Sequence, residues 1–259
     1  MDLGLKGRKA VLSASSKGLG KACALALARE GCSVTINGRD PDRLAAAAAE
    51  IRAATGAAVT PVAADINTET GRHSLIAACP EADILVTNNE GPPPGKLADW
   101  DRAAWTRALE ANMLAPIFLI QALVPGMRAR KFGRIVNITS AMVKSPNPAM
   151  GLSTAARTGL TALCKSLSRE IAVDNVTINN LLPERFDTDR QRFMAERIMK
   201  AEGVNFEEAR RRIVATIAAG RFGRPEEFGD ACAFLCSAQA GFISGQNLQL
   251  DGGSYRGLI

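Results

Sequence analysis

The sequence predicts a single α/β domain over residues 1–259, built as a doubly wound, seven-stranded parallel sheet flanked by helices. Two observations predict this fold class. Short apolar runs alternate with longer helical patterns along the whole chain, as expected of strands joined by crossover helices. The 259 residues are 47% hydrophobic and 22% charged, enough for one large core, and no linker or internal repeat divides them.

The predicted strands are short apolar runs rich in Val, Ile and Leu, and they end at polar or glycine-containing segments. In chain order they cover residues 9–13, 33–37, 59–62, 83–87, 134–139, 177–182 and 247–250.

The segments between the strands have helical periodicity and many alanines. They cover residues 18–30, 40–55, 69–79, 100–130, 153–173 and 225–237, with a mainly helical excursion at 189–219. Asp40 opens its segment and is expected to be the N-cap of that helix. Ligands of doubly wound sheets bind at the carboxyl ends of the strands, so the GPPPG loop at 91–95, directly after the fourth strand, is expected beside one.

The charge and cysteine patterns argue against several other functions. The net charge of +6 could indicate nucleic acid or a membrane surface, but only arginines 210–212 form a compact run. They follow Glu207 and Glu208 in a helical pattern, which favours a solvated helix face. The six cysteines have no zinc-ligand spacing, so no metal site is predicted, and no segment has the character of a signal peptide or membrane span. We therefore expect a cytoplasmic protein.

The segment SASSKGLG at 13–20 connects the first strand directly to the first helix. Glycines in such a turn let the backbone approach a pyrophosphate, and the helix N-terminus supplies N–H donors. After the second strand stands Asn37-Gly38-Arg39, where an acidic residue would bind the ribose diol of NAD(H). Arg39 can instead bind a 2′-phosphate, with Lys17 approaching it, so the sequence favours NADP(H) over NAD(H). The alternative for Arg39 is an ordinary exposed loop arginine.

These residues resemble the short-chain dehydrogenase/reductase family, whose glycine pattern is Thr-Gly-x-x-x-Gly-x-Gly. Gly18 and Gly20 match, and Ser13-Ala14 replaces Thr-Gly. Residues 87–90 (TNNE) stand at the family's Asn-Asn-Ala-Gly, and the tail from 223 to 253 is close to its C-terminal pattern.

The resemblance, nearest to 3-oxoacyl-ACP reductase-like members, implies a Rossmann-like fold with residues 189–219 as a substrate lid. It also implies a homodimer or homotetramer assembled through helices 100–130 and 153–173. The residues that it places at the cofactor are Ser13, Ser15, Ser16, Lys17, Gly18, Leu19, Gly20, Asn37, Arg39, Asp65, Ile66, Asn88, Asn89, Arg157, Pro183 and Thr188.

The catalytic positions depart from the family. There, an Asn in the long helix supports a proton relay and a Ser polarises the carbonyl; thirteen residues later a Tyr transfers the proton, with a Lys four residues further on. Carried onto this chain, these positions are Asn112, Ser140, Ser153 and Arg157. A serine is less acidic and shorter than tyrosine, and an arginine binds a ribose but cannot relay a proton. A subgroup of the family with a GGPPPG-type loop resembles this chain in having Ser…Arg here.

Two functions are therefore predicted as alternatives. The first is an oxidoreductase acting on a small carbonyl/alcohol pair, with water or Lys144 as proton donor. The second is a nucleotide-binding pseudoenzyme, a sensor or assembly subunit without turnover. Glu90 and Glu184 are expected near the nicotinamide pocket, where they hinder the cofactor or select a cationic substrate, unless they are solvent-facing loop acids.

Overall fold

The computed structural model describes residues 2–258 and contains one sheet of seven parallel strands. The strand order is β3-β2-β1-β4-β5-β6-β7, so the predicted doubly wound sheet is confirmed. The strands are β1 (Lys9–Leu12), β2 (Ser33–Gly38), β3 (Val59–Ala63), β4 (Ile84–Thr87), β5 (Gly133–Ile138), β6 (Val176–Pro183) and β7 (Asn247–Leu250).

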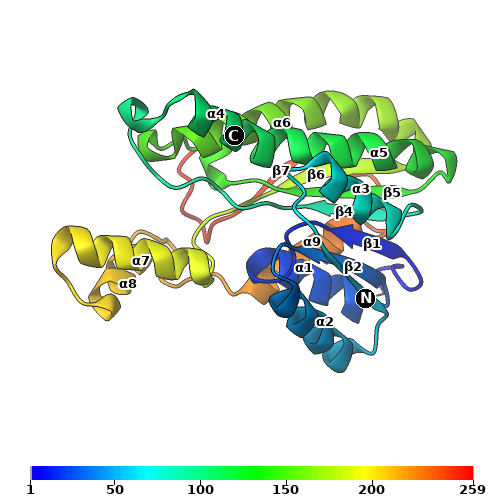
Figure 1. Cartoon of the computed structure of the whole chain (residues 1–259), viewed down its shortest axis with the longest axis horizontal. Coiled ribbons are helices and arrows are strands. Elements are labelled where there is room, and N and C mark those ends of the chain that lie inside the picture. Colours follow the sequence, from blue (N-terminus) through cyan, green and yellow to red (C-terminus); the bar gives the residue numbers. More distant parts are fainter. Residues whose placement is uncertain (1, 259) are drawn as a thin grey trace.

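Helices cover both faces of the sheet (Figure 1). One face carries α1 (Gly18–Arg29), α2 (Pro41–Thr55) and α9 (Pro225–Cys236). The other carries α3 (Glu69–Ala77), α4 (Arg102–Leu109), α5 (Ala115–Ala129) and α6 (Gly151–Ile171). The core consists of two layers of mainly aliphatic side chains, one on each face of the sheet. Cys232 and Cys236 are fully buried in the first layer, as core residues.

The direction of winding reverses beside β1, because β2 pairs with one of its edges and β4 with the other. At such a reversal the loops after the two strands diverge and leave a crevice at the carboxyl edge of the sheet. The loop from β1 into α1 and the loop after β4 therefore border the same crevice.

The ends of the helices follow local signals in the sequence. The side chain of Asp40 accepts a hydrogen bond from the Arg43 amide at 3.1 Å, which confirms Asp40 as the N-cap of α2. The same helix ends at Gly56, whose φ of +71° is the left-handed conformation that glycine adopts most readily.

The expected helical excursion is two helices, α7 (Asp189–Glu202) and α8 (Phe206–Val214). It ends before residue 219, because the chain turns after Val214 and reaches a positive φ at Gly220. Figure 1 shows α7 and α8 beside the layered body, and Ala195, Ala209 and Ile213 form a small core between them.

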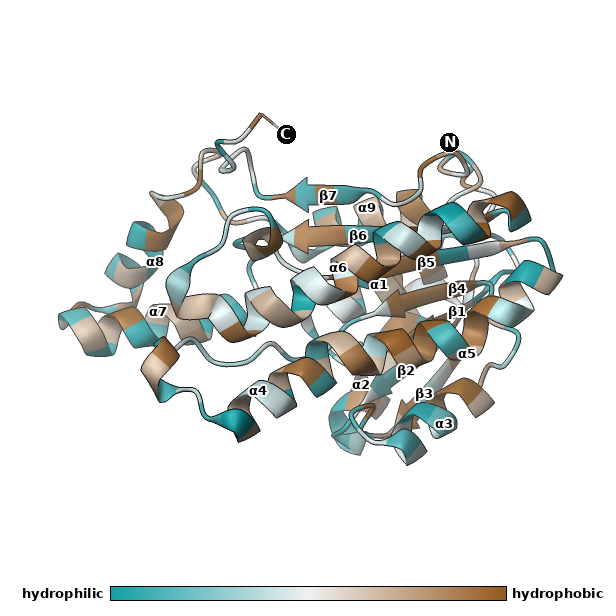
Figure 2. Cartoon of the chain, turned by 90° about the horizontal axis from the view of Figure 1, so that it is seen from above, coloured by the Kyte–Doolittle hydropathy of each residue, from teal (hydrophilic) through white to brown (hydrophobic). Residues whose placement is uncertain are grey.

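The helical segment Arg102–Ala129 is long enough to cross a membrane and contains an 18-residue stretch that is apolar enough, with a mean hydropathy of 1.5. In this fold it lies against the sheet, and its Leu119, Leu123 and Met127 are buried in the core. Figure 2 shows hydrophobic residues concentrated in the central strands and polar ones recurring along the helices. Core packing therefore accounts for the hydropathy of this segment.

Candidate functional site

The turn between β1 and α1 is so tight that only glycine fits at one of its positions. A Cβ on Gly20 would lie 2.5 Å from the carbonyl oxygen of Ala14, and Gly18 has a φ of +56°. Ala14 also has a positive φ, +43°, where the family has glycine. The turn therefore survives the Gly-to-Ala difference, with Ala14 in a backbone conformation that an L-residue adopts at a cost.

Several residues expected at the cofactor build this turn with their side chains. Ser13 Oγ donates to the carbonyl of Asn88 at 2.7 Å and accepts from the Asn88 amide at 2.9 Å. Asn88 Nδ2 donates to the Ala14 carbonyl at 2.9 Å. Ser15 Oγ accepts from the Asn37 amide at 3.0 Å, and Asn37 Oδ1 accepts from the Ala14 amide at 3.1 Å. These four polar side chains tie the loops after β1, β2 and β4 together.

The N-terminus of α1 is open to an anion. Its N-cap, Lys17, makes no side-chain capping bond, and no acidic residue stands in the first turn. In contrast, Asp40, Thr68 and Asp101 cap α2, α3 and α4 through their side chains. The free N–H groups of α1 and its dipole suit a pyrophosphate, and the close backbone at Gly20 permits its approach. The residues present therefore fit a dinucleotide.

The two cations expected at the 2′-phosphate are both paired with carboxylates. Arg39 Nη2 lies 2.6 Å from Glu90 Oε2, and Lys17 Nζ lies 3.2 Å from Asp189 Oδ2. All four side chains are more than half exposed. The Glu90 carboxylate thus extends toward the loop after β2, and its 75% exposure agrees with the alternative of a solvent-facing loop acid.

A π-helical turn, Glu110–Leu114, joins α4 to α5 and contains Asn112. The Ala115 amide donates to the Glu110 carbonyl, and the next residue, Pro116, has no N–H. The Ala111 carbonyl consequently has no helical donor, and it accepts from Asn89 Nδ2 at 2.9 Å.

The side chain of Asn112 is buried at the same turn. Its Nδ2 donates to the Glu90 carbonyl at 3.3 Å, whereas its Oδ1 has no hydrogen-bond partner among the described residues. A buried acceptor without a donor is costly, so this oxygen is suited to a bound water or ligand.

Ser153 and Arg157 lie one turn apart on α6 and are bonded to each other. Arg157 Nε donates to Ser153 Oγ at 3.2 Å, and Arg157 Nη1 donates to the Ile138 carbonyl at 2.7 Å, two residues before Ser140. Burial, and then the charge of Arg190, lower the pKa of Arg157 to about 10, so the guanidinium stays charged near neutrality.

The hydroxyls of Ser140 and Ser153 are both used as acceptors. Ser140 Oγ accepts from the Met142 amide at 3.2 Å, as the cap of a short 3₁₀ turn, and Ser153 Oγ accepts from Arg157. Each O–H remains available to donate to a ligand. Because α6 packs against both the π turn and this 3₁₀ turn, the four expected catalytic positions lie around one helix.

The GPPPG loop is held against the start of α6 by Trp100. A Cβ on Gly95 would lie 2.7 Å from Trp100 Nε1, and a Cβ on Gly151 would lie 2.6 Å from the same indole ring. The Gly95 amide also donates to the Ala149 carbonyl at 2.9 Å. Trp100 thus fixes the loop relative to the helix that carries Ser153 and Arg157.

The remaining expected cofactor residues lie around the crevice without forming one cluster. Ser16 Oγ lies 2.9 Å from a Cβ built on Gly38, and Thr188 Cγ2 lies 3.9 Å from one built on Gly18, so the start of α7 faces the start of α1. Ile66 is buried. Leu19 is the second residue of α1, Asp65 follows β3, and Pro183 is the last residue of β6.

Glu184 and Lys144 have different surroundings. Glu184 is half-buried, and burial raises the pKa of its carboxyl, with Arg185 Nε at 3.8 Å. Lys144 is exposed in the loop after Ser140, and its Nζ lies 5.8 Å from the ring centre of Tyr255.

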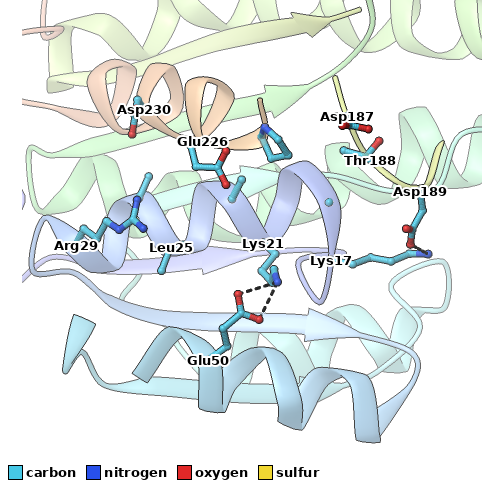
Figure 3. A pocket seen from close by; sticks show the side chains of 14 residues that line it. Lys17, Lys21, Leu25, Arg29, Glu50, Asp187, Thr188, Asp189, Glu226 and Asp230 are labelled. Carbon is cyan, nitrogen blue, oxygen red and sulfur yellow. Dashed lines mark hydrogen bonds and ion pairs between the residues drawn. The ribbon is translucent and has the colours of Figure 1, made fainter. Parts of the chain in front are cut away.

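A groove of about 350 Å³ runs along the outer side of α1 (Figure 3). It reaches the glycine turn at Lys17 and Gly18, and Lys21 pairs there with Glu50 at 2.8 Å. Its lining includes none of the expected catalytic positions. The groove therefore borders the cofactor crevice but is separate from the Ser140–Arg157 cluster.

Sequence reasoning missed Arg190 and Trp100. Arg190 Nη2 donates to the Pro92 carbonyl at 3.3 Å and so joins α7 to the GPPPG loop. No motif marks either residue. The Pro116 that follows Asn112 by four residues was the one signal that could have predicted the irregular turn.

Comparisons with known proteins agree with this geometry. The family model described as Enoyl-(Acyl carrier protein) reductase matches residues 13–255. The chain is 32% identical to the uncharacterized oxidoreductase YvaG of Bacillus subtilis, over 100% of both chains. It is 30% identical to the NADPH-dependent reductase BacG of the same organism, over 97% of this chain and 99% of that one. Its structure resembles L-sorbose reductase from Gluconobacter frateurii complexed with NADPH and L-sorbose, with a TM-score of 0.95, 29% identity and full coverage of both chains.

Proposed function

The chain belongs to the short-chain dehydrogenase/reductase family and is an oxidoreductase of that family, and from this premise we propose that it uses NADP(H) to interconvert a small carbonyl compound and its alcohol. The observation that carries the proposal is the uncapped N-terminus of α1 behind a glycine turn, with Ser140, Ser153 and Arg157 at the same edge of the sheet. The names of BacG and of the sorbose reductase complex include NADPH, which supports the choice of cofactor.

Arg39 supports NADP(H) over NAD(H), because no acidic residue stands at its position directly after β2. A 2′-phosphate carries more charge than the Glu90 carboxylate and offers several oxygens to a guanidinium. We infer that the phosphate takes the place of Glu90 at Arg39, assisted by Lys17.

The residues of this chain can perform carbonyl chemistry without the usual tyrosine. A bound NADPH supplies a hydride to the carbonyl carbon, and one proton completes the alcohol at the oxygen. Ser140 and Ser153 donate their free O–H groups to that oxygen, and the Arg157 charge stabilises the negative charge that develops. The proton comes from water or from Lys144 in the exposed loop. Asn112 orients a water through its unpartnered Oδ1.

The test begins with fluorescence titrations of NADPH and NADH, followed by absorbance assays with ketones, diketones, quinones and 3-oxoacyl thioesters. We expect Ser140→Ala to lower kcat by about 10²–10³-fold, the loss typical of one oxyanion donor, with the NADPH Kd unchanged. Ser145→Ala, in the same exposed loop, is the matched control. Tight NADPH binding without turnover of any substrate would favour the nucleotide-binding pseudoenzyme, and absence of binding would refute both functions.

We also propose that the chain is cytoplasmic and forms a homodimer or homotetramer through α4–α5 and α6, with α7–α8 as the substrate lid. Phe118 on α5 and Leu163 on α6 are each 40% exposed, so both helices present apolar surface that a second copy could cover. Light scattering of the wild type and of Phe118→Lys would test the assembly. A monomeric wild type would contradict it.

A further inference from the structure

Two arginines from different helices reach successive residues of the GPPPG loop. Arg157 comes from α6, and its Nη2 lies 3.6 Å from a Cβ built on Gly91. Arg190 comes from α7, and its Nη2 donates to the Pro92 carbonyl at 3.3 Å. The two guanidinium groups therefore lie against the same short stretch of backbone.

Neither guanidinium has a carboxylate partner within residues 2–258. Arg157 is 7% exposed and bonds only to Ser153 and a backbone carbonyl, and Arg190 makes no ion pair. Glu90, the carboxylate that acts on Arg190, is bonded to Arg39. Buried charges in proteins are normally paired, so two neighbouring cations without a partner leave a local excess of positive charge.

The repulsion between the two groups is part of their electrostatics. Burial lowers the pKa of Arg157 first, and the Arg190 charge lowers it further. Burial also lowers the pKa of Arg190. An anion bound between the two guanidinium groups would compensate both the loss of water around them and their mutual repulsion.

Arg157 has donors left for such an anion. A guanidinium carries five N–H groups, and two of these are used in the bonds to Ser153 and Ile138. The Nη2 group that faces Gly91 makes no hydrogen bond within residues 2–258 and can bind a carboxylate side by side with a donor of Arg190.

We propose that Arg157 and Arg190 bind an anionic group of the substrate, and that the substrate is an oxo acid whose carboxylate is attached to the reacting carbonyl carbon or to its neighbour. The spacing follows from the bond between Ser153 and Arg157. Because Ser153 Oγ is 3.2 Å from Arg157 Nε, a carbonyl oxygen on the serine lies next to an anion on the guanidinium. This substrate class rests on the proposed function, since it takes the carbonyl at Ser153 as the group that is reduced.

The same anion chemistry has a second source, the diphosphate of the cofactor. That group has its own donors at the N-terminus of α1. Arg157 instead contacts the end of β5, two strands from β1, beside the serines that are to hold the carbonyl. These positions favour the substrate, and the experiment separates the two sources.

The first arm compares acids with their uncharged esters in the cofactor-loaded enzyme. The probes are pyruvate and acetoacetate against methyl pyruvate and methyl acetoacetate. We expect Arg190→Gln to lower kcat/KM for the acids by about 10- to 100-fold, the loss typical of a hydrogen bond between charged groups, and to leave the esters within twofold. Arg192→Gln removes an exposed charge from the same helix and should change neither.

The second arm needs no turnover. Oxamate, an unreactive analogue of a 2-oxo acid, is titrated calorimetrically into the protein with and without NADP⁺, and NADP⁺ is titrated separately. The expected result is weaker oxamate binding in Arg190→Gln with an unchanged NADP⁺ Kd. Equal losses for oxamate and NADP⁺ would overturn the assignment to the substrate, because the anion would then be the diphosphate.

The two arms also separate this inference from the proposed function. Oxamate binding that depends on Arg190, in a protein that reduces nothing, would support the anion site while refuting the reductase. Reduction of ketones with equal kcat/KM for acids and esters, unaffected by Arg190→Gln, would support the reductase and overturn the oxo-acid inference.

Discussion

The ion pair between Arg39 and Glu90 should lower the affinity for NADPH, and Glu90→Gln removes it with little change in shape. The two groups are 2.6 Å apart, with side chains 63% and 75% exposed. Exposed pairs of this kind contribute about 0.2–1 kcal/mol, which corresponds to a factor of roughly 1.4 to 5 in a binding constant. If the 2′-phosphate has to take the place of Glu90, the variant should bind NADPH about 1.4- to 5-fold more tightly, and NADH with unchanged affinity.

The assay is a fluorescence titration of both cofactors against wild type, Glu90→Gln, Arg39→Gln and the double variant. Arg39→Gln should weaken NADPH binding. The double variant should bind NADPH no more tightly than Arg39→Gln alone, because both substitutions act through the same contact. The gain should also diminish in high salt, which screens exposed charges. An equal gain for NADH, or a gain that persists without Arg39, would refute the reasoning.

Three further predictions concern other parts of the fold. Ala14→Gly should relieve the strain of the positive φ, +43°, at this position. Glycine also makes the unfolded chain more flexible, and with this entropic cost subtracted the protein should be about 0.5–1 kcal/mol more stable. Calorimetry should then show a Tm about 1–4 °C higher, and an unchanged or lower Tm would contradict this. Trp100→Ala should loosen the GPPPG loop and speed amide hydrogen exchange at Gly95 while leaving exchange in the central strands unchanged, and equal acceleration everywhere would instead indicate general destabilisation. Burial raises the pKa of the Glu184 carboxyl above its ordinary 4.5, so the folded protein holds this proton more tightly than the unfolded chain does. The free energy of unfolding of the wild type therefore increases as the pH falls through the raised pKa. Glu184→Gln should therefore be more stable than wild type at pH 7, by denaturant unfolding, with the difference narrowing toward pH 4.5; a constant difference would be the opposing result.

The fold was predictable because its signals are local. Apolar runs mark each strand, and the last strand is found at 247–250, as predicted. The cap at Asp40 follows from the residue type and its position before a helix. Helix ends were harder to place, since the chain turns after Val214 without a strong stop signal there.

The sequence predicted which residues belong to the site but not how they contact one another. The motif spacing identifies Ser140, Ser153 and Arg157, but it does not show that Ser153 and Arg157 bond to each other. Pairs such as Arg39 with Glu90 join residues 51 positions apart, and such contacts are set by how the loops after separate strands meet. The role of Arg190 depends in the same way on where α7 lies relative to the loop after β4.

The π turn at Glu110–Leu114 also constrains how this protein can change in length. An α-helix advances about 100° per residue, so deleting one residue from the turn would convert α4 and α5 into one regular helix and rotate α4 by roughly that angle. Ala108 would leave the buried face, and after a deletion at Glu110 the Ala111 carbonyl would regain the Ala115 amide as a helical donor and no longer need Asn89. A single-codon deletion here would thus detach the loop after β4 from its anchor, although the composition of the helix would hardly change.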